Sequence, residues 1–176
     1  MSPRFIRQGL FFFGLTTFLI SCIEPPDFSD IPEISSPSVT SYPTFDDFSQ
    51  VPKDSLVITV RFQDGDGDLG LSAEERQKID TVAYKNWGNY EIKTYRFVNG
   101  KFESVNLAVL DKLFFPRLKP DDKKSPLEGK LDFSQSFLRS RGYKLTPVKF
   151  AIRIRDRRLN VSNVVETDTI SVPLNF

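Results

Sequence analysis

Three aspartates alternate with two glycines in the stretch QDGDGDLGL, which spans residues 63–71. Asp64, Asp66 and Asp68 place three like charges two residues apart, on a backbone that glycine makes pliable. Carboxylate and carbonyl oxygens are the ligands that Ca²⁺ prefers, and the ion takes about six to eight of them. The spacing therefore predicts a calcium-binding loop.

The stretch shares its D-x-D-x-D start with an EF-hand loop but departs from that loop in two ways. Leu69 occupies the sixth position, where the EF-hand needs glycine. The stretch also follows an apolar alternation that is typical of a strand, not a helix. Glu75 stands at the twelfth position, but with Ser72 it has the spacing of a capping box. We therefore expect a short helix in SAEERQKI.

A second polar stretch, DRRLNVSN at 156–163, follows another apolar alternation. In an immunoglobulin-like sandwich the loops that follow these two strands lie at the same end. We therefore expect Asp156 and Asn160, with Asn163 beside them, to complete an oxygen cage with the aspartates.

Two alternatives to a metal remain open. Arg157 and Arg158 can neutralise the aspartates through charge-assisted hydrogen bonds. The aspartates and glycines can also form a solvated turn, in which they serve backbone geometry alone. Even with calcium, we expect the loop to be stiffened by the ion and not to catalyse a reaction.

The composition argues against an enzyme and against a nucleic-acid-binding protein. The chain has no His, which is the usual general base at neutral pH and the commonest zinc ligand. Three acids within five residues resemble a cation site more than the paired carboxylates of a glycosidase. The 24 Lys and Arg nearly balance the 23 Asp and Glu, so the chain lacks a basic footprint for nucleic acid.

Aromatic residues cluster in AYKNWGNY, which contains Tyr84, Trp87 and Tyr90. Aromatic side chains on a loop can stack on a sugar or grip a protein. They can also fold down as the lid of a hydrophobic core. A glycan- or protein-binding module is therefore the alternative function.

The N-terminus has the layout of a secretory signal peptide, with Arg4 and Arg7 before an apolar run at 10–20 that is too short to span a bilayer. The residues LISC at 19–22 resemble the bacterial lipobox, in which the signal is cut before the cysteine and the thiol is lipidated. Cys22 is the single cysteine of the chain. We expect a signal peptide at 1–21 and stable membrane attachment through Cys22.

The remaining chain divides into a tether and one domain. Residues 22–45 are rich in Pro, Ser and Asp, which favours a flexible tether, with a short strand within 31–39. Residues 46–176 show apolar alternation with one polar face, which is typical of antiparallel sheets. The alternation predicts that Ile152 and Phe133 face the core and that Arg155 lies on the polar face, and Asn99–Gly100 predicts a two-residue hairpin turn. We predict an all-β, immunoglobulin-like sandwich of about seven strands, with an open barrel as the alternative. The expected strands span 31–39, 55–63, 90–98, 102–109, 127–137, 147–155 and 164–173.

The stretches VRFQDGDGDLGL and IRIRDRRLNVSNVVET together resemble a group of uncharacterised Bacteroidota lipoproteins. The resemblance implies a lipid-anchored outer-membrane protein with an immunoglobulin-like domain. It implies no activity, because none is established for the group. A short, lipid-tethered sandwich without catalytic residues suits an accessory subunit of an envelope protein assembly, which is the function that we expect.

Overall fold

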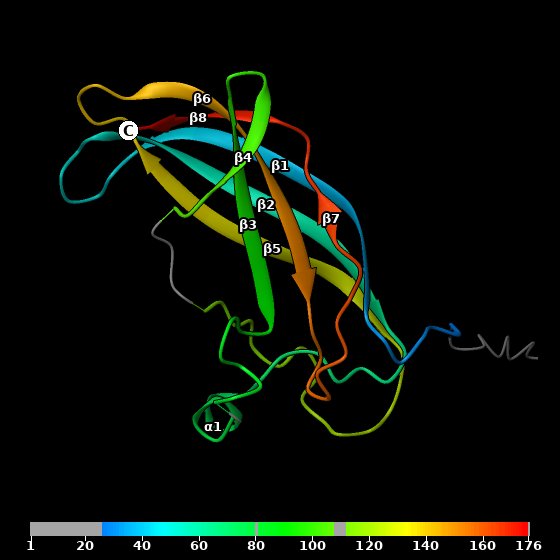
Figure 1. The fold of residues 1–176 in the computed structure, drawn as a ribbon. Helices are drawn as coiled ribbons and strands as arrows, with labels where there is room; N and C mark the ends of the chain where they lie inside the picture. The colour runs from blue at the N-terminus through cyan, green and yellow to red at the C-terminus, as the bar shows by residue number, and fades with distance from the viewer. Residues whose placement is uncertain (1–25, 80, 108–111, 176) are drawn as a thin grey trace, which may run out of the picture.

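The computed structural model describes residues 26–79, 81–107 and 112–175. The chain folds into two antiparallel sheets that pack face to face, with a single short helix at one end (Figure 1). This confirms the predicted all-β sandwich. The predicted signal peptide at 1–21 and the predicted lipidation site at Cys22 lie outside the described residues.

The first sheet has three strands in the order β1-β2-β5. They are β1 (Glu33–Phe45), β2 (Pro52–Asp64) and β5 (Leu127–Leu138). Alternate residues of the central strand β2 are buried, since Leu56, Ile58 and Val60 are each 0% exposed. The period-two pattern in the sequence therefore identified the inward face of this strand correctly.

The second sheet has five strands in the order β4-β3-β6-β7, and β8 also pairs with β6. They are β3 (Tyr90–Val98), β4 (Lys101–Val105), β6 (Lys144–Ile154), β7 (Val165–Glu166) and β8 (Ile170–Leu174). The last predicted strand is thus two short strands. They are separated where Thr167 turns inward and its Oγ1 accepts a hydrogen bond of 3.1 Å from the Phe150 N–H.

The predicted tether at 22–45 extends too far into the domain. Residues 33–45 form β1, which pairs antiparallel with β2 as far as Phe45 opposite Pro52. The sandwich therefore begins at residue 33 and not at residue 46. The strand predicted at 31–39 is therefore present but continues to Phe45. Its second half was missed because Pro43 disguises the pattern, and an edge strand tolerates proline where a central strand does not.

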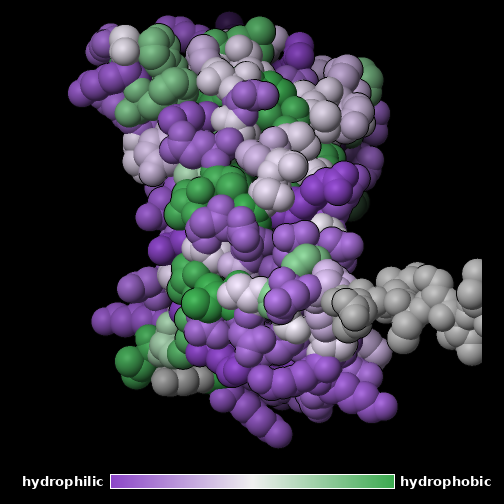
Figure 2. All heavy atoms as spheres, turned by 90° about the vertical axis from the view of Figure 1, so that its right-hand side faces the viewer, coloured by the Kyte–Doolittle hydropathy of each residue, from purple (hydrophilic) through white to green (hydrophobic). Residues whose placement is uncertain are grey.

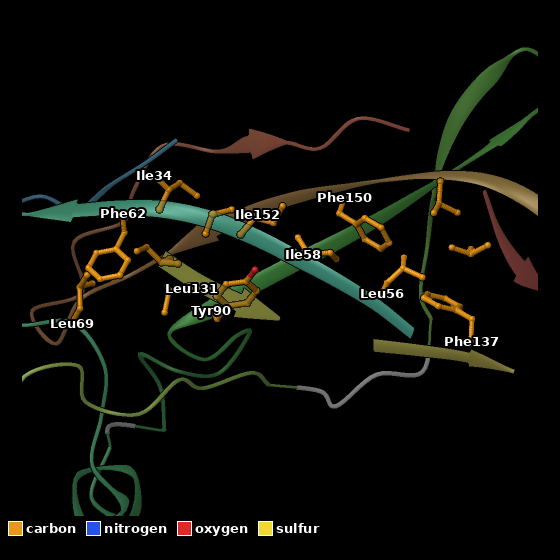
Figure 3. Packing of buried hydrophobic residues seen from close by; sticks show 14 of the residues in the cluster. Ile34, Leu56, Ile58, Phe62, Leu69, Tyr90, Leu131, Phe137, Phe150 and Ile152 are labelled. Carbon is orange, nitrogen blue, oxygen red and sulfur yellow. The ribbon is translucent and has the colours of Figure 1, made fainter. Parts of the chain in front are cut away.

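The core is formed by the inward faces of both sheets, with Ile58 on β2 opposite Phe150 and Ile152 on β6 (Figure 3). Ile152 is fully buried, as predicted, whereas Phe133 is only partly buried and stacks on Tyr90 at a centroid distance of 5.9 Å. Figure 2 shows one outer face of the molecule, on which hydrophilic side chains predominate. Among the described residues, no helix has the length and apolar character needed to cross a bilayer.

The sandwich has two contrasting ends (Figure 1). The loop end contains residues 65–79, 81–89, 112–126 and 155–164, with the helix α1 (Ala73–Gln77). The hairpin end contains the turns at 46–51, 99–100 and 139–143. The Asn99–Gly100 turn has positive φ angles of 51° and 84°, as predicted for a two-residue hairpin turn.

The helix α1 begins at the predicted capping box. Ser72 Oγ accepts a hydrogen bond of 3.1 Å from the Glu75 N–H, and the Glu75 carboxylate accepts one of 2.6 Å from the Ser72 N–H. Glu75 therefore caps the helix.

Candidate metal centre

Three of the predicted ligands converge at the loop end. Asp64 is the last residue of β2, and Asp156 follows the end of β6 in the opposite sheet. One carboxylate oxygen of Asp64, one of Asp68 and one of Asp156 all lie within 4.8 Å of one another. Asp64 and Asp156 are 0% and 1% exposed. The shared end of the two loops, inferred from the sequence, thus brings these three carboxylates together.

The turn after β2 determines which aspartates meet. Gly67 has a φ of +69°, a conformation that glycine adopts without strain. The chain turns there, and the Asp68 N–H donates a hydrogen bond of 2.9 Å to Asp64 Oδ2. Asp64 and Asp68 therefore lie side by side, and Asp66 between them points elsewhere.

The loop is held in place by the backbone on either side of it. The Gly65 N–H donates a 2.8 Å hydrogen bond to the Ser29 carbonyl, and a Cβ atom at Gly65 would clash with the Phe28 carbonyl. A Cβ atom at Gly70 would clash with the Pro116 carbonyl in the same way. The glycines thus permit close packing of three chain segments. This packing explains why glycine is needed at these positions, but it does not explain why aspartates alternate with the glycines.

Leu69 explains why the loop is not an EF-hand. Its side chain is fully buried and lies beside Phe62 at the end of the hydrophobic core (Figure 3). The sixth position of the stretch is therefore an apolar anchor that holds the aspartate loop on the sandwich.

Two oxygens of the cluster are left over. Asp64 Oδ1 and Asp68 Oδ1 are buried and have no hydrogen-bond donor among the described residues; we call them the free oxygens. Asp156 differs, because its Oδ1 accepts a bond of 2.8 Å from the Asn160 N–H and its Oδ2 accepts one of 2.7 Å from the Asn160 amide. A buried carboxylate oxygen without a donor destabilises the fold unless a proton or a cation compensates it.

The electrostatics of the cluster agree with its hydrogen bonding. Burial, together with the charge of Asp68, raises the pKa of Asp64 to about 6. Burial also raises the pKa of Asp68, with the charge of Asp156 adding to the effect and Arg157 opposing it. Burial raises the pKa of Asp156, while its bonds to Asn160 oppose the rise. Each carboxylate is thus harder to ionise than usual, as expected for an anionic cluster without a counter-ion.

Asp66 does not belong to this cluster. It is 4% exposed, and its two carboxylate oxygens accept no hydrogen bond from the described residues. Its charge is instead offset by an ion pair with Arg158 and by Lys124, whose Nζ lies 3.9 Å from its Oδ2. Arg158 Nε also donates a hydrogen bond of 3.2 Å to Asp68 Oδ2. The arginine alternative therefore describes Asp66 and one oxygen of Asp68, and it leaves the free oxygens unaccounted for.

Arg157 plays a different part from Arg158. Its guanidinium lies near Glu75 and Asp122, at 4.0 Å from each, and its backbone N–H donates to the Asp68 carbonyl at 3.3 Å. Arg157 thus ties the helix α1 and the 112–126 segment to the site without pairing directly with the clustered carboxylates.

The two asparagines predicted for the cage support it from outside. Asn160 orients Asp156 through the two hydrogen bonds described above. Asn163 accepts a bond of 2.9 Å from the Ile34 N–H and donates one of 2.8 Å to the Ile34 carbonyl, so it joins this loop to β1.

The aromatic cluster packs against the sandwich. Tyr84 and Tyr90 are each 5% exposed, and Trp87 is half-buried. The rings of Tyr84 and Trp87 lie on either side of the Arg155 guanidinium, with both centroids 4.1 Å from it. Tyr84 and Tyr90 thus fold down onto the sandwich, as the lid alternative predicts. Of the three aromatic residues, Trp87 alone keeps part of its surface exposed.

Arg155 is the residue of this region that sequence reasoning misplaced. Its place in the alternation predicted the polar face of β6, yet it is 5% exposed. Arg155 does lie on the predicted side of the strand, but the 81–89 loop covers that side of the sheet at this point. The guanidinium donates to three carbonyls of that loop, at 3.0 Å to Ala83, at 2.7 Å to Gly88, and to Trp87. Local sequence carries no signal for this cover.

The sequence predicts a long connection at 110–126, and the structure describes it from residue 112 on. Residues 112–126 form one wall of the site. The Leu118 N–H donates to the Leu69 carbonyl at 3.2 Å, and the Ser125 N–H donates to the Asp66 carbonyl at 3.4 Å. The buried Asn89 side chain holds the start of this segment through two bonds to the Phe115 backbone, of 3.0 Å and 2.8 Å.

Comparison of the chain with protein-family models, with curated proteins and with solved structures finds no match. The functional conclusion therefore depends on the geometry of the loop end and on the sequence.

Proposed function

We propose that the protein is a non-catalytic, lipid-anchored outer-membrane lipoprotein whose sandwich is stiffened at the loop end by a calcium ion. The observation that carries the calcium site is the position of the free oxygens. They are buried, and they belong to Asp64 and Asp68, two residues that each place a carboxylate oxygen within 4.8 Å of one of Asp156.

The chemistry of the donors favours calcium over other common cations. The cluster offers oxygen ligands only, whereas zinc sites are built mainly from nitrogen and sulfur. Calcium accepts variable numbers of oxygens, while magnesium needs a small, strict octahedral shell. Asp64, Asp68 and Asp156 would hold the ion, and its two positive charges would offset the repulsion among their three negative charges.

A structural role follows from what these residues connect. Asp64 ends β2 and Asp156 follows β6, so an ion between them would cross-link the two sheets. The hydrogen bonds of the aspartate loop extend that link to Ser29 and to Leu118. The ion would thus fix three loops at one end of a small sandwich.

Calorimetric titration and thermal unfolding of residues 22–176 test the site directly. We expect calcium to bind and to raise the melting temperature over EDTA by several degrees, and magnesium to do so less. Asp64→Asn should abolish the response, and Asp168→Asn, which changes an exposed carboxylate outside the cluster, should retain it. Identical melting curves in calcium and in EDTA, with no heat of binding at millimolar calcium, would exclude the ion.

The membrane anchor rests on the lipobox that ends in Cys22. Cys22→Ala should leave an uncut precursor or move the protein to the soluble fraction. Processing and membrane attachment identical to those of the unchanged protein would show that the anchor is elsewhere.

An accessory subunit of an envelope assembly is the biological role that we favour for this anchored sandwich. The alternative is a surface module that binds a glycan or a protein, and Trp87 is the aromatic residue with surface left for contact. Co-purification with a membrane protein supports the subunit, whereas glycan retention that is lost in Trp87→Ala supports the module.

A further inference from the structure

We infer that the loop end is the membrane-facing surface of the anchored protein and that its partner there is the layer of anionic lipid headgroups. The inference rests on the proposed anchor at Cys22. It adds an orientation to that anchor and a second role for the cation centre.

The described chain enters the sandwich at the loop end (Figure 1). Ser29 accepts the hydrogen bond from the Gly65 N–H, so the entry point is joined to the aspartate loop. Asp30 lies 3.6 Å from Lys124 and 3.7 Å from Arg158 in two further ion pairs. The first folded residues are therefore held beside the cation centre before β1 begins.

The chain between the anchor and this entry point is short. Phe28 is six residues after Cys22 in the sequence. A fully extended chain spans at most about 3.6 Å per residue, which gives a reach of about 22 Å. The strand β1 has 13 residues, and at about 3.3 Å per residue it carries the chain about 43 Å further, to the hairpin end. The anchor can therefore bring the loop end to the membrane surface, and it cannot reach the hairpin end.

Charge supports the same orientation. Lys123 and Lys124 are exposed at the loop end, and the Arg158 side chain is 45% exposed. Cationic side chains near a membrane surface are attracted to anionic headgroups. The exposed Asp121 and Asp122 in the same segment oppose this attraction, as do the three clustered carboxylates. A bound divalent cation would cancel most of the charge of the three clustered carboxylates. The cation centre would thus favour the seating of the loop end on the membrane.

The opposite end then faces away from the membrane. Phe48 is 98% exposed there, in a turn where Asp46 Oδ1 accepts hydrogen bonds of 3.3 Å and 3.0 Å from the N–H groups of Phe48 and Ser49. This orientation presents the aromatic ring outward on a well-defined turn.

Energy transfer to the membrane surface tests the orientation. The full lipidated protein is reconstituted in vesicles of phosphatidylethanolamine and phosphatidylglycerol that carry a headgroup-attached acceptor. With Cys22 blocked by its lipid, a donor is attached to Gln77→Cys at the loop end or to Asp47→Cys at the hairpin end, both exposed positions. We expect strong transfer from position 77 and weak transfer from position 47. Equal transfer from the two positions overturns the orientation.

Flotation and chelation separate the possible failures. Protein that does not float with the vesicles refutes the anchor, and the orientation falls with it. Protein that floats but shows equal transfer refutes the orientation alone. With the protein still floating, EDTA should lower the transfer from position 77, and calcium should restore it. Transfer that is unchanged by EDTA overturns the role of the cation centre in seating.

Discussion

Arg155 and Asp156 are neighbours in the chain and both are buried, but they differ in whether the surrounding protein compensates their charge. The Arg155 guanidinium donates to three carbonyls and lies between two aromatic rings. Asp156 joins a cluster of three carboxylates that includes the free oxygens of Asp64 and Asp68. The positive charge is satisfied by the fold alone, and the negative cluster is not.

The difference separates a structural charge from a binding site. A buried ion that already has its partners has no need of a ligand, whereas a buried anionic cluster without them gains from a cation. Arg155 should therefore contribute equally to the free energy of unfolding with and without calcium. The contribution of the aspartates to the free energy of unfolding should instead change with calcium concentration and with pH.

The largest effect should come from Arg155→Met. The substitution keeps apolar volume but leaves the carbonyls of Ala83, Trp87 and Gly88 without their donor, at a cost of about 4 kcal/mol in the free energy of unfolding. Urea unfolding should show the same loss in calcium and in EDTA. Arg153→Met, at a half-exposed position beside Trp87, should cost under about 1 kcal/mol. If calcium restored the stability lost in Arg155→Met, Arg155 would not be a purely structural charge, and the contrast with the aspartates would be wrong.

The next effect is a pH dependence that comes from Asp64. Its pKa is about 6 in the metal-free folded state, against an ordinary value of 3.8, so the folded state binds the proton more tightly than the unfolded state. The resulting destabilisation is fully present above the folded pKa and disappears as the pH falls toward 4, a change of about 3 kcal/mol.

The measurement is urea unfolding in EDTA between pH 4 and pH 7, with Asp64→Asn as the matched variant. We expect the variant to lose this part of the slope and to be more stable than the unchanged protein at pH 7. Saturating calcium should remove the slope from the unchanged protein, because the ion holds the carboxylate ionised. Parallel pH profiles for the two proteins in EDTA would refute the assignment to Asp64.

Calcium itself should stabilise the protein by about 2.7 kcal/mol at a hundredfold excess over its Kd. Asp156→Asn should lose this increment, because it removes one charge from the cluster. Asp66→Asn should retain most of it, because Asp66 pairs with Arg158 and Lys124 outside the cluster. Equal losses in the two variants, measured as the calcium-dependent shift in urea midpoint, would place Asp66 in the site.

The smallest effect should come from Arg158→Gln. The guanidinium lies beside Asp68 and repels an incoming cation, so its removal should tighten calcium binding about fivefold, equivalent to about 1 kcal/mol. Calorimetry measures this change, and Lys144→Gln, at an exposed position on the hairpin side of β6, is the control. Weaker binding in Arg158→Gln would mean that Arg158 positions the carboxylates more than it competes with the ion.

The strands were predictable wherever alternation was clear. The bounds of β3 at 90–98 are those expected, because its alternation is bordered by a turn signal at Asn99–Gly100. Pro43 hid the second half of the edge strand β1, where the cost of a proline is low. The site was predictable in part, because the loops after β2 and β6 share an end in this architecture. The exclusion of Asp66 was not, because it depends on the turn at Gly67.

The sequence by itself determined the all-β sandwich, the inward face of each main strand, the capping box and the meeting of Asp64 with Asp156. These follow from period-two patterns and residue spacing, which act over a few residues. Only the tertiary structure decided that Arg155 is buried under the 81–89 loop, that Asp66 turns to Arg158, and that the chain enters beside the aspartate loop. These depend on segments far apart in the sequence, and the way such segments cover one another leaves no local pattern.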